Sequence, residues 1–561
     1  MECEFDCCEG RTPGRLNTPS AALKTASRLL TRKREAALLP SGMDRRDFLS
    51  RASFGLAAGL AAATPPAAAA SFTGAPTTTK RDLVIAQGSD VTSLDPHAST
   101  LSSDSRIAFN IFDTLIRRHS DGSLHPALAT TWKRTTPTTW QLALRSDVRW
   151  HDGARFSSVD AKYSLDRTYD ATLKAARLLG AWWTEAIERT EAPDPGTLII
   201  HTRWPDLLLP ARLASCAGTM VPWTHIDRVG FKAFNEHPVG SGPLRFVSRS
   251  KRDQCLLDAN PDYWDGRVDV DRVVFKSVPD PERRVDLLLR GAADIIVPLA
   301  PEHGPRVASG PATQVVGVLY AGLYVLAVNV WVAPLNDPLI RQALSLAIDR
   351  ETIVKELWRG RGVVPNGPIP RGDALHDPSL RTLPYDPGTA RERLKRAGYR
   401  GEAIHFETTA GMIANDRAMA EAIAEMWEDI GVKVVLDVID TEVRHRKNRQ
   451  QSFKGLWWSD PTSIIRDPDG MMGRLLSPGQ PHDYWRHDEF DRLAITARRS
   501  ADDRARSEAY RKMTEIFLDE NPWIVVLQPV EDYGLRRYVQ FTPNPDQQFD
   551  LRRVNFWMRR P

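Results

Sequence analysis

The amino-acid sequence predicts an α/β protein with mixed sheets, folded as two lobes. Short apolar strands alternate with amphipathic helices through both halves of the chain, which is the pattern of α/β architectures. Residues 403–439 have the pattern of a strand, a helix and a second strand, a β-α-β unit. With 561 residues the chain is too long for a single hydrophobic core, so two lobes are expected.

The first half of the chain is expected to begin with a strand at 82–87 and a helix at 105–118, because apolar residues there recur at helical spacing. Alternating apolar residues over 139–153 predict a hairpin. The elements expected next are a strand at 197–203, a hairpin at 242–260, a strand at 271–280, a helix at 281–292 and a strand at 293–299.

His151 and Asp152 stand side by side and raise the question of an active site, since a base and its orienting carboxylate look like this. They fall where a turn is expected, with Gly153 supplying a positive φ. Ser157 and Asp160 have the spacing of a capping box that opens the following helix. We therefore interpret this stretch as structural.

The second half is expected to begin with a strand at 319–330. A long helix is predicted over 336–360, with Asp337 as its cap and Pro338 at its first position. The last two elements expected are a helix at 386–399 and a strand at 523–530.

Composition and charge exclude some classes of protein. The formal net charge is only +4, and basic and acidic residues are interleaved, so the concentrated basic face of a nucleic-acid binder is not expected. The sixteen tryptophans are many, and tryptophan in excess is common where ligands are stacked or clamped.

Residues 43–70 have the composition of an export signal: a charged start, a short Ala- and Gly-rich apolar run and a small-residue cleavage site. The pair Arg45 and Arg46 resembles the twin-arginine export motif. Cleavage is expected after Ala70, and residues 1–42 are interpreted as a leader or a misassigned start. The apolar run is shorter than the roughly 18–20 residues of a membrane span. The mature chain is therefore expected to be soluble and outside the cytoplasm.

The five cysteines divide into two groups. Cys3, Cys7 and Cys8 precede the expected cleavage site, and only Cys216 and Cys255 follow it. The last two form either one disulfide or two buried thiols, and the sequence leaves both alternatives open.

Signatures of catalysis are missing from the sequence. It contains no GxSxG, HExxH, GxxxxGK[ST] or GxGxxG motif. The densest group of side chains of the kind that bind metals is His482, Asp483, His487, Asp488, Glu489 and Asp491. Its spacing fits no known metal motif, so a solvated loop is expected, with no metal and no cofactor.

Seven blocks, in order, resemble the solute-binding protein family 5 of ABC importers, the dipeptide/oligopeptide-binding family. They are 93–97, 124–167, 238–246, 260–266, 278–295, 340–354 and 385–399. In this family the stretch around His151 and Asp152 is a turn in a structural subdomain, which agrees with the interpretation given above.

The resemblance implies a bilobed periplasmic binding protein fold of type II with an extra subdomain and a ligand cleft between the lobes. It implies a lobe I made of discontinuous segments, a small structural subdomain and a lobe II. The expected bounds are 71–117, 206–322 and 524–561 for lobe I, 118–205 for the subdomain and 323–523 for lobe II.

The resemblance also implies a function. A monomer in the periplasm, exported by the twin-arginine machinery, captures a peptide-like or other small polar solute and delivers it to an inner-membrane ABC permease with its ATPase. No enzymatic activity is implied. A peptide, an opine-like conjugate, a sugar derivative and a metal chelate all remain open as ligands. The alternatives are an exported hydrolase-like enzyme and a solute sensor that is not coupled to transport.

Trp457 and Asp460 resemble the segment in which peptide-binding members place the carboxylate for the peptide's amino terminus. Asp460 is thus a candidate partner for a ligand cation, the alternative being a loop cap before Pro461. Trp457 and Trp458 are either a wall of the site or core packing. Arg466 is either a bidentate partner for a ligand anion or a surface charge.

Three further residues are candidates for ligand binding. Asn329 and Tyr324 lie where the chain is expected to cross between the lobes. Ser241 stands where the family usually has threonine.

Overall fold

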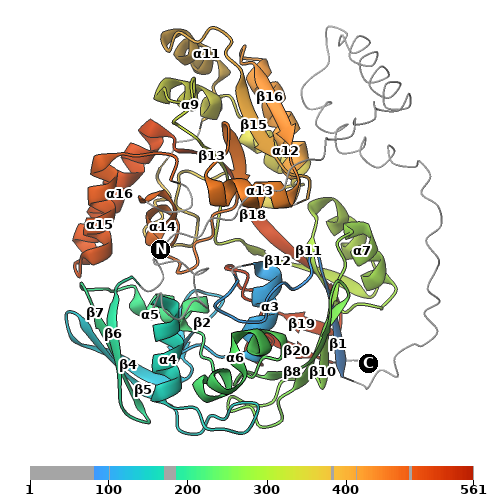
Figure 1. The fold of residues 1–561 in the computed structure, drawn as a ribbon. Helices are drawn as coiled ribbons and strands as arrows, with labels where there is room; N and C mark the ends of the chain where they lie inside the picture. The colour runs from blue at the N-terminus through green and yellow to red at the C-terminus, as the bar shows by residue number, and fades with distance from the viewer. Residues whose placement is uncertain are drawn as a thin grey trace, which may run out of the picture. The chain divides into compact units, whose positions relative to one another are not determined.

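The computed structural model describes residues 81–99, 101–169, 185–380, 384–411, 413–478 and 483–559 (Figure 1). The expected export signal, the leader before it and the three cysteines of the leader lie outside the described residues. Within the described ranges, no helix combines the length and the apolar character that a membrane span requires.

One sheet of twelve strands organises the chain. Its order is β16-β15-β17-β13-β18-β11-β1-β10-β9-β8, and β12 and β14 pair with β18 beside this path. Parallel and antiparallel pairs both occur, as predicted. The strands are β1 (Asp82–Gln87), β8 (Leu244–Ser250), β9 (Gln254–Ala259), β10 (Arg272–Ser277), β11 (Ile295–Leu299), β12 (Thr313–Leu319), β13 (Tyr324–Val328), β14 (Gly362–Val363), β15 (Ile404–Thr408), β16 (Val434–Val438), β17 (Leu456–Ser459) and β18 (Trp523–Arg536).

Strand β18 joins the two ends of this sheet. Its first residues pair with β13, whereas residues 530–536 pair with β12 and, near Leu535, with β11. We call β8, β9, β10, β1, β11 and β12 the first half-sheet, and β13, β17, β15 and β16 the second half-sheet. The strand predicted at 523–530 is confirmed, and it continues to Arg536 because the same strand serves both half-sheets.

The first half-sheet is covered on both faces. In β1, Leu83 and Ile85 join one hydrophobic core, and Val84 and Ala86 join another, as the alternation of side chains along a strand requires. Helices α3 (Ser102–Ile111) and α6 (Trp223–Glu236) contribute to the first core, and α7 (Pro281–Leu289) and α8 (Gly304–Ala308) to the second. The helix expected at 105–118 ends at Ile111, and residues 116–118 form strand β2 instead.

A separate sheet of four strands has the order β4-β5-β7-β6. Its strands are β4 (Ala129–Thr136), β5 (Thr139–Leu144), β6 (Ile187–Asp194) and β7 (Thr197–Thr202). The hairpin expected within 139–153 is wrong, because β5 pairs with β4 and β7. Val148 and Trp150 pack into the core of this small sheet, with α4 (Ser158–Tyr169) and α5 (Leu209–Leu213) beside them.

Two pairs of short strands complete the sheets. Strand β2 (Ile116–Arg118) pairs with β3 (Leu124–Pro126), and β19 (Val539–Phe541) pairs with β20 (Phe556–Met558). In the described part of the chain, short 3-10 turns lie at η3 (Cys216–Gly218), η4 (Pro301–His303) and η6 (Pro468–Gly470).

The second half-sheet carries the remaining helices. The β-α-β unit predicted at 403–439 is confirmed, since β15 and β16 are parallel and α12 connects them. The helices are α9 (Pro338–Leu346), α10 (Arg350–Thr352), η5 (Ile353–Leu357), α11 (Pro387–Arg396), α12 (Asp416–Glu428), α13 (Thr441–Gln450), α14 (Met472–Leu476), α15 (Asp488–Arg499) and α16 (Asp503–Glu520).

The long helix predicted over 336–360 is broken. Asp337 caps α9 as predicted, since its carboxylate accepts a hydrogen bond from the Leu339 backbone N–H. The helix then ends at Leu346 because Asp349 acts as a second cap, with its carboxylate accepting from Thr352. The cap at Asp349 therefore divides the predicted helix in two, although its apolar residues continue at helical spacing.

Cys216 and Cys255 are both free, so of the two alternatives the pair of separate thiols is correct. Burial raises the pKa of each thiol to about 12. Both thiols therefore stay protonated and unreactive near neutral pH.

Candidate functional site

Two stretches of chain cross between the half-sheets. Residues 320–323 join β12 to β13, and the second crossing lies in β18 at Gln528. Gln528 is fully buried and ties the two crossings together. Its Nε2 donates to the Tyr320 carbonyl at 2.7 Å, and its Oε1 accepts from the Arg371 backbone N–H at 2.9 Å.

The segment that follows β17 lies directly on the first crossing. The Leu323 backbone N–H donates to the Pro461 carbonyl at 3.1 Å, and the Ser463 N–H donates to the Ala321 carbonyl at 2.6 Å. The Ala321 N–H in turn donates to the Pro545 carbonyl at 2.8 Å, near the end of the chain. These bonds hold Asp460, the residue after β17, at the place where the two halves of the molecule meet.

Asp460 lies among aromatic hydroxyls and one arginine. Its side chain is partly exposed, yet the surrounding protein raises the pKa of the carboxyl by desolvation, and Arg444 opposes that rise. Burial and the Asp460 charge both raise the pKa values of Tyr320 and Tyr324 well above the usual range. Among the described residues, Asp460 makes no ion pair within 4.0 Å. Its carboxylate is therefore the acceptor here that remains available to a bound molecule.

Arg444 comes from α13 and points toward the same place. Its Nη2 donates to the Trp458 carbonyl at 3.1 Å, and burial lowers its pKa while Asp460 and Asp416 oppose the change. Sequence reasoning missed Arg444 and Tyr320. The signal for Arg444 was present, since α13 carries several basic residues without a buried apolar face, but nothing in the sequence separates the inward arginine from the exposed ones.

Glu531 lies in the part of β18 that pairs with the first half-sheet. Its negative charge also raises the pKa values of Tyr320 and Tyr324. It is paired with Arg106 of α3 at 3.3 Å. The candidate site therefore brings Tyr324 and Asp460, both expected from the sequence, together with Tyr320, Arg444 and the Glu531–Arg106 pair.

Trp457 and Trp458 are each only 1% exposed and lie within β17. Trp457 stacks on Phe453 with ring centroids 4.2 Å apart, and the Trp458 Nε1 donates to the Asp416 carbonyl at 3.0 Å. Both rings therefore pack in the core of the second half, which is the alternative that competed with a ligand wall.

The remaining three candidates are committed to other residues. Arg466 is paired with Asp373 at 2.7 Å and donates Nη2 to the Gly372 carbonyl. Ser241 is buried and donates to Asp113 at 3.0 Å. Asn329 donates to the Phe453 carbonyl at 2.8 Å and holds the end of β13. These bonds supply structural roles for all three side chains.

The stretch around His151 is a turn, as predicted. Gly153 has a φ of 91°, and its N–H donates to the Trp150 carbonyl at 2.8 Å. His151 Nδ1 accepts from the Gly240 N–H and Nε2 donates to the Gly242 carbonyl, so both ring nitrogens are occupied. Burial lowers the pKa of His151 to about 4. The imidazole thus stays neutral and fixes the turn against the first half of the molecule.

The capping box at the start of α4 is also confirmed, because the Asp160 carboxylate accepts from the Ser157 N–H at 2.9 Å.

In the group of possible metal ligands near residue 487, His482 lies outside the described residues. His487 caps α15 by accepting from the Phe490 N–H. Over the ranges that the structure describes, no three His, Cys, Asp or Glu side chains form a group able to hold a metal ion.

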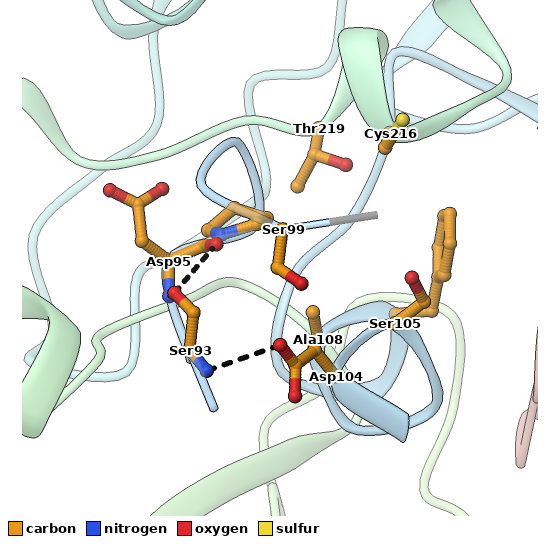
Figure 2. Close-up of a pocket in the computed structure, with 10 residues that line it drawn as sticks. Ser93, Asp95, Ser99, Asp104, Ser105, Ala108, Cys216 and Thr219 are labelled. Carbon is orange, nitrogen blue, oxygen red and sulfur yellow. Dashed lines mark hydrogen bonds between the residues drawn. The ribbon is translucent and has the colours of Figure 1, made fainter. Parts of the chain in front are cut away.

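Two hollows elsewhere in the molecule differ in size. The one in Figure 2, between the Ser93–Ser99 loop, α3 and η3, offers about 10 Å³, the space of one water molecule. Asp104 and Ser93 are hydrogen-bonded to each other there. A larger hollow of about 370 Å³ lies between the loop at 366–380 and α16. Neither contains Asp460.

Comparison with known proteins adds to this geometry. The family model for bacterial extracellular solute-binding proteins, family 5, matches residues 123–483. The glutathione-binding protein GsiB of Salmonella typhimurium is 26% identical over 502 residues, covering 86% of this chain and 96% of the relative.

Solved structures show the same fold. The periplasmic binding protein DppA from Helicobacter pylori, in complex with the peptide STSA, has a TM-score of 0.77 at 23% identity, covering 85% of this chain and 98% of its own. A dipeptide-binding protein from Pseudoalteromonas sp. SM9913, in complex with Met-Leu, has a TM-score of 0.78 at 20% identity, covering 85% and 100%. The bilobed binding-protein fold predicted from the sequence is confirmed.

Proposed function

Because the chain belongs to family 5 of the bacterial extracellular solute-binding proteins, we propose that its ligand is a peptide-like solute with a free ammonium group. The chain is the extracytoplasmic solute-binding component of an ABC importer. The ligand lies between the two lobes at the crossings, and the protein delivers it to an inner-membrane permease and its ATPase.

The Asp460 carboxylate carries this proposal. It lies beside the first crossing, it has no ion pair within 4.0 Å among the described residues, and desolvation raises the pKa of its carboxyl. A ligand ammonium placed against it would offset the cost of keeping that charge away from water. Arg444 and the Tyr324 hydroxyl supply further donors for the polar groups of a peptide, whereas the Tyr320 hydroxyl is already bonded to Thr462 and the Asp460 carbonyl.

The ligands named for the relatives support the same chemistry. One relative is a glutathione-binding protein, and two solved neighbours hold the peptide STSA and the dipeptide Met-Leu. Each of these three molecules combines a free ammonium with amide bonds. We propose a ligand of this class over a sugar derivative or a metal chelate, which offer no ammonium to Asp460.

We keep the three-part division of the chain as a proposal: lobe I from 71–117, 206–322 and 524–561, a subdomain at 118–205, and lobe II at 323–523. Strand β18 pairs with β13 before Gln528 and with β12 after it, which supports lobe boundaries near the crossings. They also favour ending lobe II close to Gln528, since residues 523–527 pair with β13.

We further propose that the protein is a periplasmic monomer, that the twin-arginine machinery exports it, and that the ligand is released chemically unchanged. Replacing both Arg45 and Arg46 with lysine should leave precursor in the cytoplasm. Amino-terminal sequencing of the periplasmic protein should start near Ser71. Periplasmic protein that still begins at Met1 would contradict the export proposal.

The ligand proposal is tested by thermal unfolding of the purified protein with glutathione, Met-Leu and a tetrapeptide, each against its N-acetylated form. A ligand that binds only the folded state raises the melting temperature. Stabilisation by a free-amine compound and not by its acetylated form supports the proposal. Equal stabilisation by both forms overturns it, and mass spectrometry of what co-purifies from the native periplasm then identifies the ligand. Chromatography of each mixture checks that no ligand is converted.

A further inference from the structure

A second set of contacts joins the two lobes through different residues. On one side is the stretch from Glu185 to Gly218, which includes β6, β7, α5 and η3. On the other side are the segment 464–474 and the end of α15. Figure 1 shows α14 (Met472–Leu476), which begins in that segment, above α5. Leu208 and Ala217 of the first side form a small buried cluster with Ile465 of the second.

A chain of ion pairs runs through this contact. Asp469 is 0% exposed and Arg212 of α5 is 1% exposed, and they meet at 3.1 Å. Asp469 also meets Arg498 of α15 at 3.0 Å, and Arg498 meets Glu185 at 2.8 Å. Arg212 is paired in addition with Asp206 on its own side. The pair Arg212–Asp469 therefore joins lobe I to lobe II, and the pair Arg498–Glu185 joins the subdomain at 118–205 to lobe II.

The remaining pairs determine what happens if the two sides separate. Arg212 keeps Asp206, and Asp469 keeps Arg498, so neither side is left with an uncompensated buried arginine or with a lone Asp469. Removing one member of a buried pair is normally costly because the other charge stays unpaired. Each buried member keeps a counter-charge on its own side, and Glu185, which loses Arg498, is partly exposed to solvent, so the contact can open and close reversibly.

A third contact crosses at the surface. The Arg499 guanidinium of α15 lies over the Trp204 ring, 4.4 Å from its centroid. Trp204 follows β7 and belongs to the first side. Two successive arginines at the end of α15, Arg498 and Arg499, therefore contact the subdomain at 118–205.

We propose that these residues form an interlobe clasp that holds the lobes together without a ligand. The clasp consists of Glu185, Trp204, Arg212, Asp469, Arg498 and Arg499. It uses none of the residues placed around Asp460, so it acts on the equilibrium between open and closed forms and not on ligand contacts. The ligand adds its binding free energy to a closed form that is already populated.

Small-angle X-ray scattering of ligand-free protein tests the clasp. The protein is unfolded in urea, freed of ligand and refolded before measurement. The double variant Glu185→Gln, Arg499→Ala removes one crossing ion pair and the crossing cation–π contact, both in partly exposed positions. We expect the ratio of closed to open form to fall about fivefold, with a larger radius of gyration.

The matched control is Arg511→Ala. Arg511 is an exposed arginine of the neighbouring helix α16, and its partners Glu508 and Glu515 lie on that same helix. The control should scatter as the wild type does. Asp469→Asn weakens the buried crossing pair itself and should lower the ratio further, roughly 20-fold.

Three results would overturn the clasp: a ligand-free wild type that is already open, crossing variants that match the wild type, or a control that opens equally. A circular-dichroism melt of every variant shows whether it is folded. The test uses no ligand, so its outcome is separate from that of the proposal for Asp460.

Discussion

Asp460 and Asp469 belong to one stretch of chain after β17, yet their surroundings are opposite. Asp469 is fully buried between Arg212 and Arg498, at 3.1 and 3.0 Å. Asp460 is partly exposed, and the nearest arginine that acts on it, Arg444, bonds instead to the Trp458 carbonyl. One carboxylate has two guanidinium partners, and the other has none within 4.0 Å in the described part of the chain.

This difference is the one expected if Asp469 has a structural role and Asp460 binds the ligand, as we propose. A buried carboxylate with two arginines is already neutralised, so a ligand cation would have to displace one of them. A carboxylate that is desolvated without a direct partner gains from a cation that arrives from outside. Charge type alone does not distinguish the two aspartates, but the presence or absence of a counter-ion does.

The largest effect on ligand affinity is expected from changing Asp460. Asp460→Ala should cost about 3–5 kcal/mol of ligand binding, a few hundred-fold or more in affinity, because the ligand ammonium is left buried without its counter-charge. Asp460→Asn should be almost as harmful, since it keeps the shape but not the charge. Isothermal titration with the co-purified ligand measures both.

The melting temperature of the ligand-free protein is the control for Asp460. It should change little in either variant, because the carboxylate supports no ion pair of the fold. Equal affinities of wild type and Asp460→Asn would show that Asp460 is only a turn residue before Pro461.

Changing Asp469 should give the opposite pattern with a smaller effect. Asp469→Asn should lower the free energy of unfolding by about 2–3 kcal/mol, since hydrogen bonds to charged groups are lost while Arg212 and Arg498 keep Asp206 and Glu185. Urea unfolding at pH 7 measures this loss. A variant as stable as the wild type would remove the distinction between the two aspartates.

Much of the fold follows from local sequence signals. The β-α-β unit of β15, α12 and β16, the cap at Asp337 and the turn at Gly153 depend on neighbours in the sequence and are confirmed. The errors arise where a second local signal competes, as at Asp349, or where partners are distant, as in the pairing of β5 with β7.

The site was predictable only in part for the same reason. Asp460 and Tyr324 were identified from the family resemblance and from the expected crossing. Arg444 and the Arg212–Asp469 pair depend on contacts between residues far apart in the chain, and spacing within the sequence does not encode them. The ion pair of Arg466 with Asp373 is a contact of the same kind.

Changing Arg444 should have the smallest effect on ligand affinity, and it tests directly how the surroundings of Asp460 set the pKa of its carboxyl. Burial raises the pKa of Asp460 and Arg444 lowers it. Without that arginine the pKa of Asp460 rises further, and a larger share of the carboxyl is protonated as the pH falls. An ammonium ligand needs the ionised form, so binding is strongest above the pKa of Asp460 and is lost as the pH falls through it. Arg444→Gln should therefore move this loss of affinity to higher pH.

The measurement for Arg444→Gln is isothermal titration with the co-purified ligand from pH 8 down to pH 5. The affinity of the variant should begin to fall at a higher pH than that of the wild type, because its Asp460 carboxyl is protonated earlier as the pH is lowered. Arg449→Gln is the control, because Arg449 is an exposed residue of the same helix. It should leave the profile where it is. If Arg444→Gln and the wild type lose affinity at the same pH, Arg444 does not alter the pKa of Asp460.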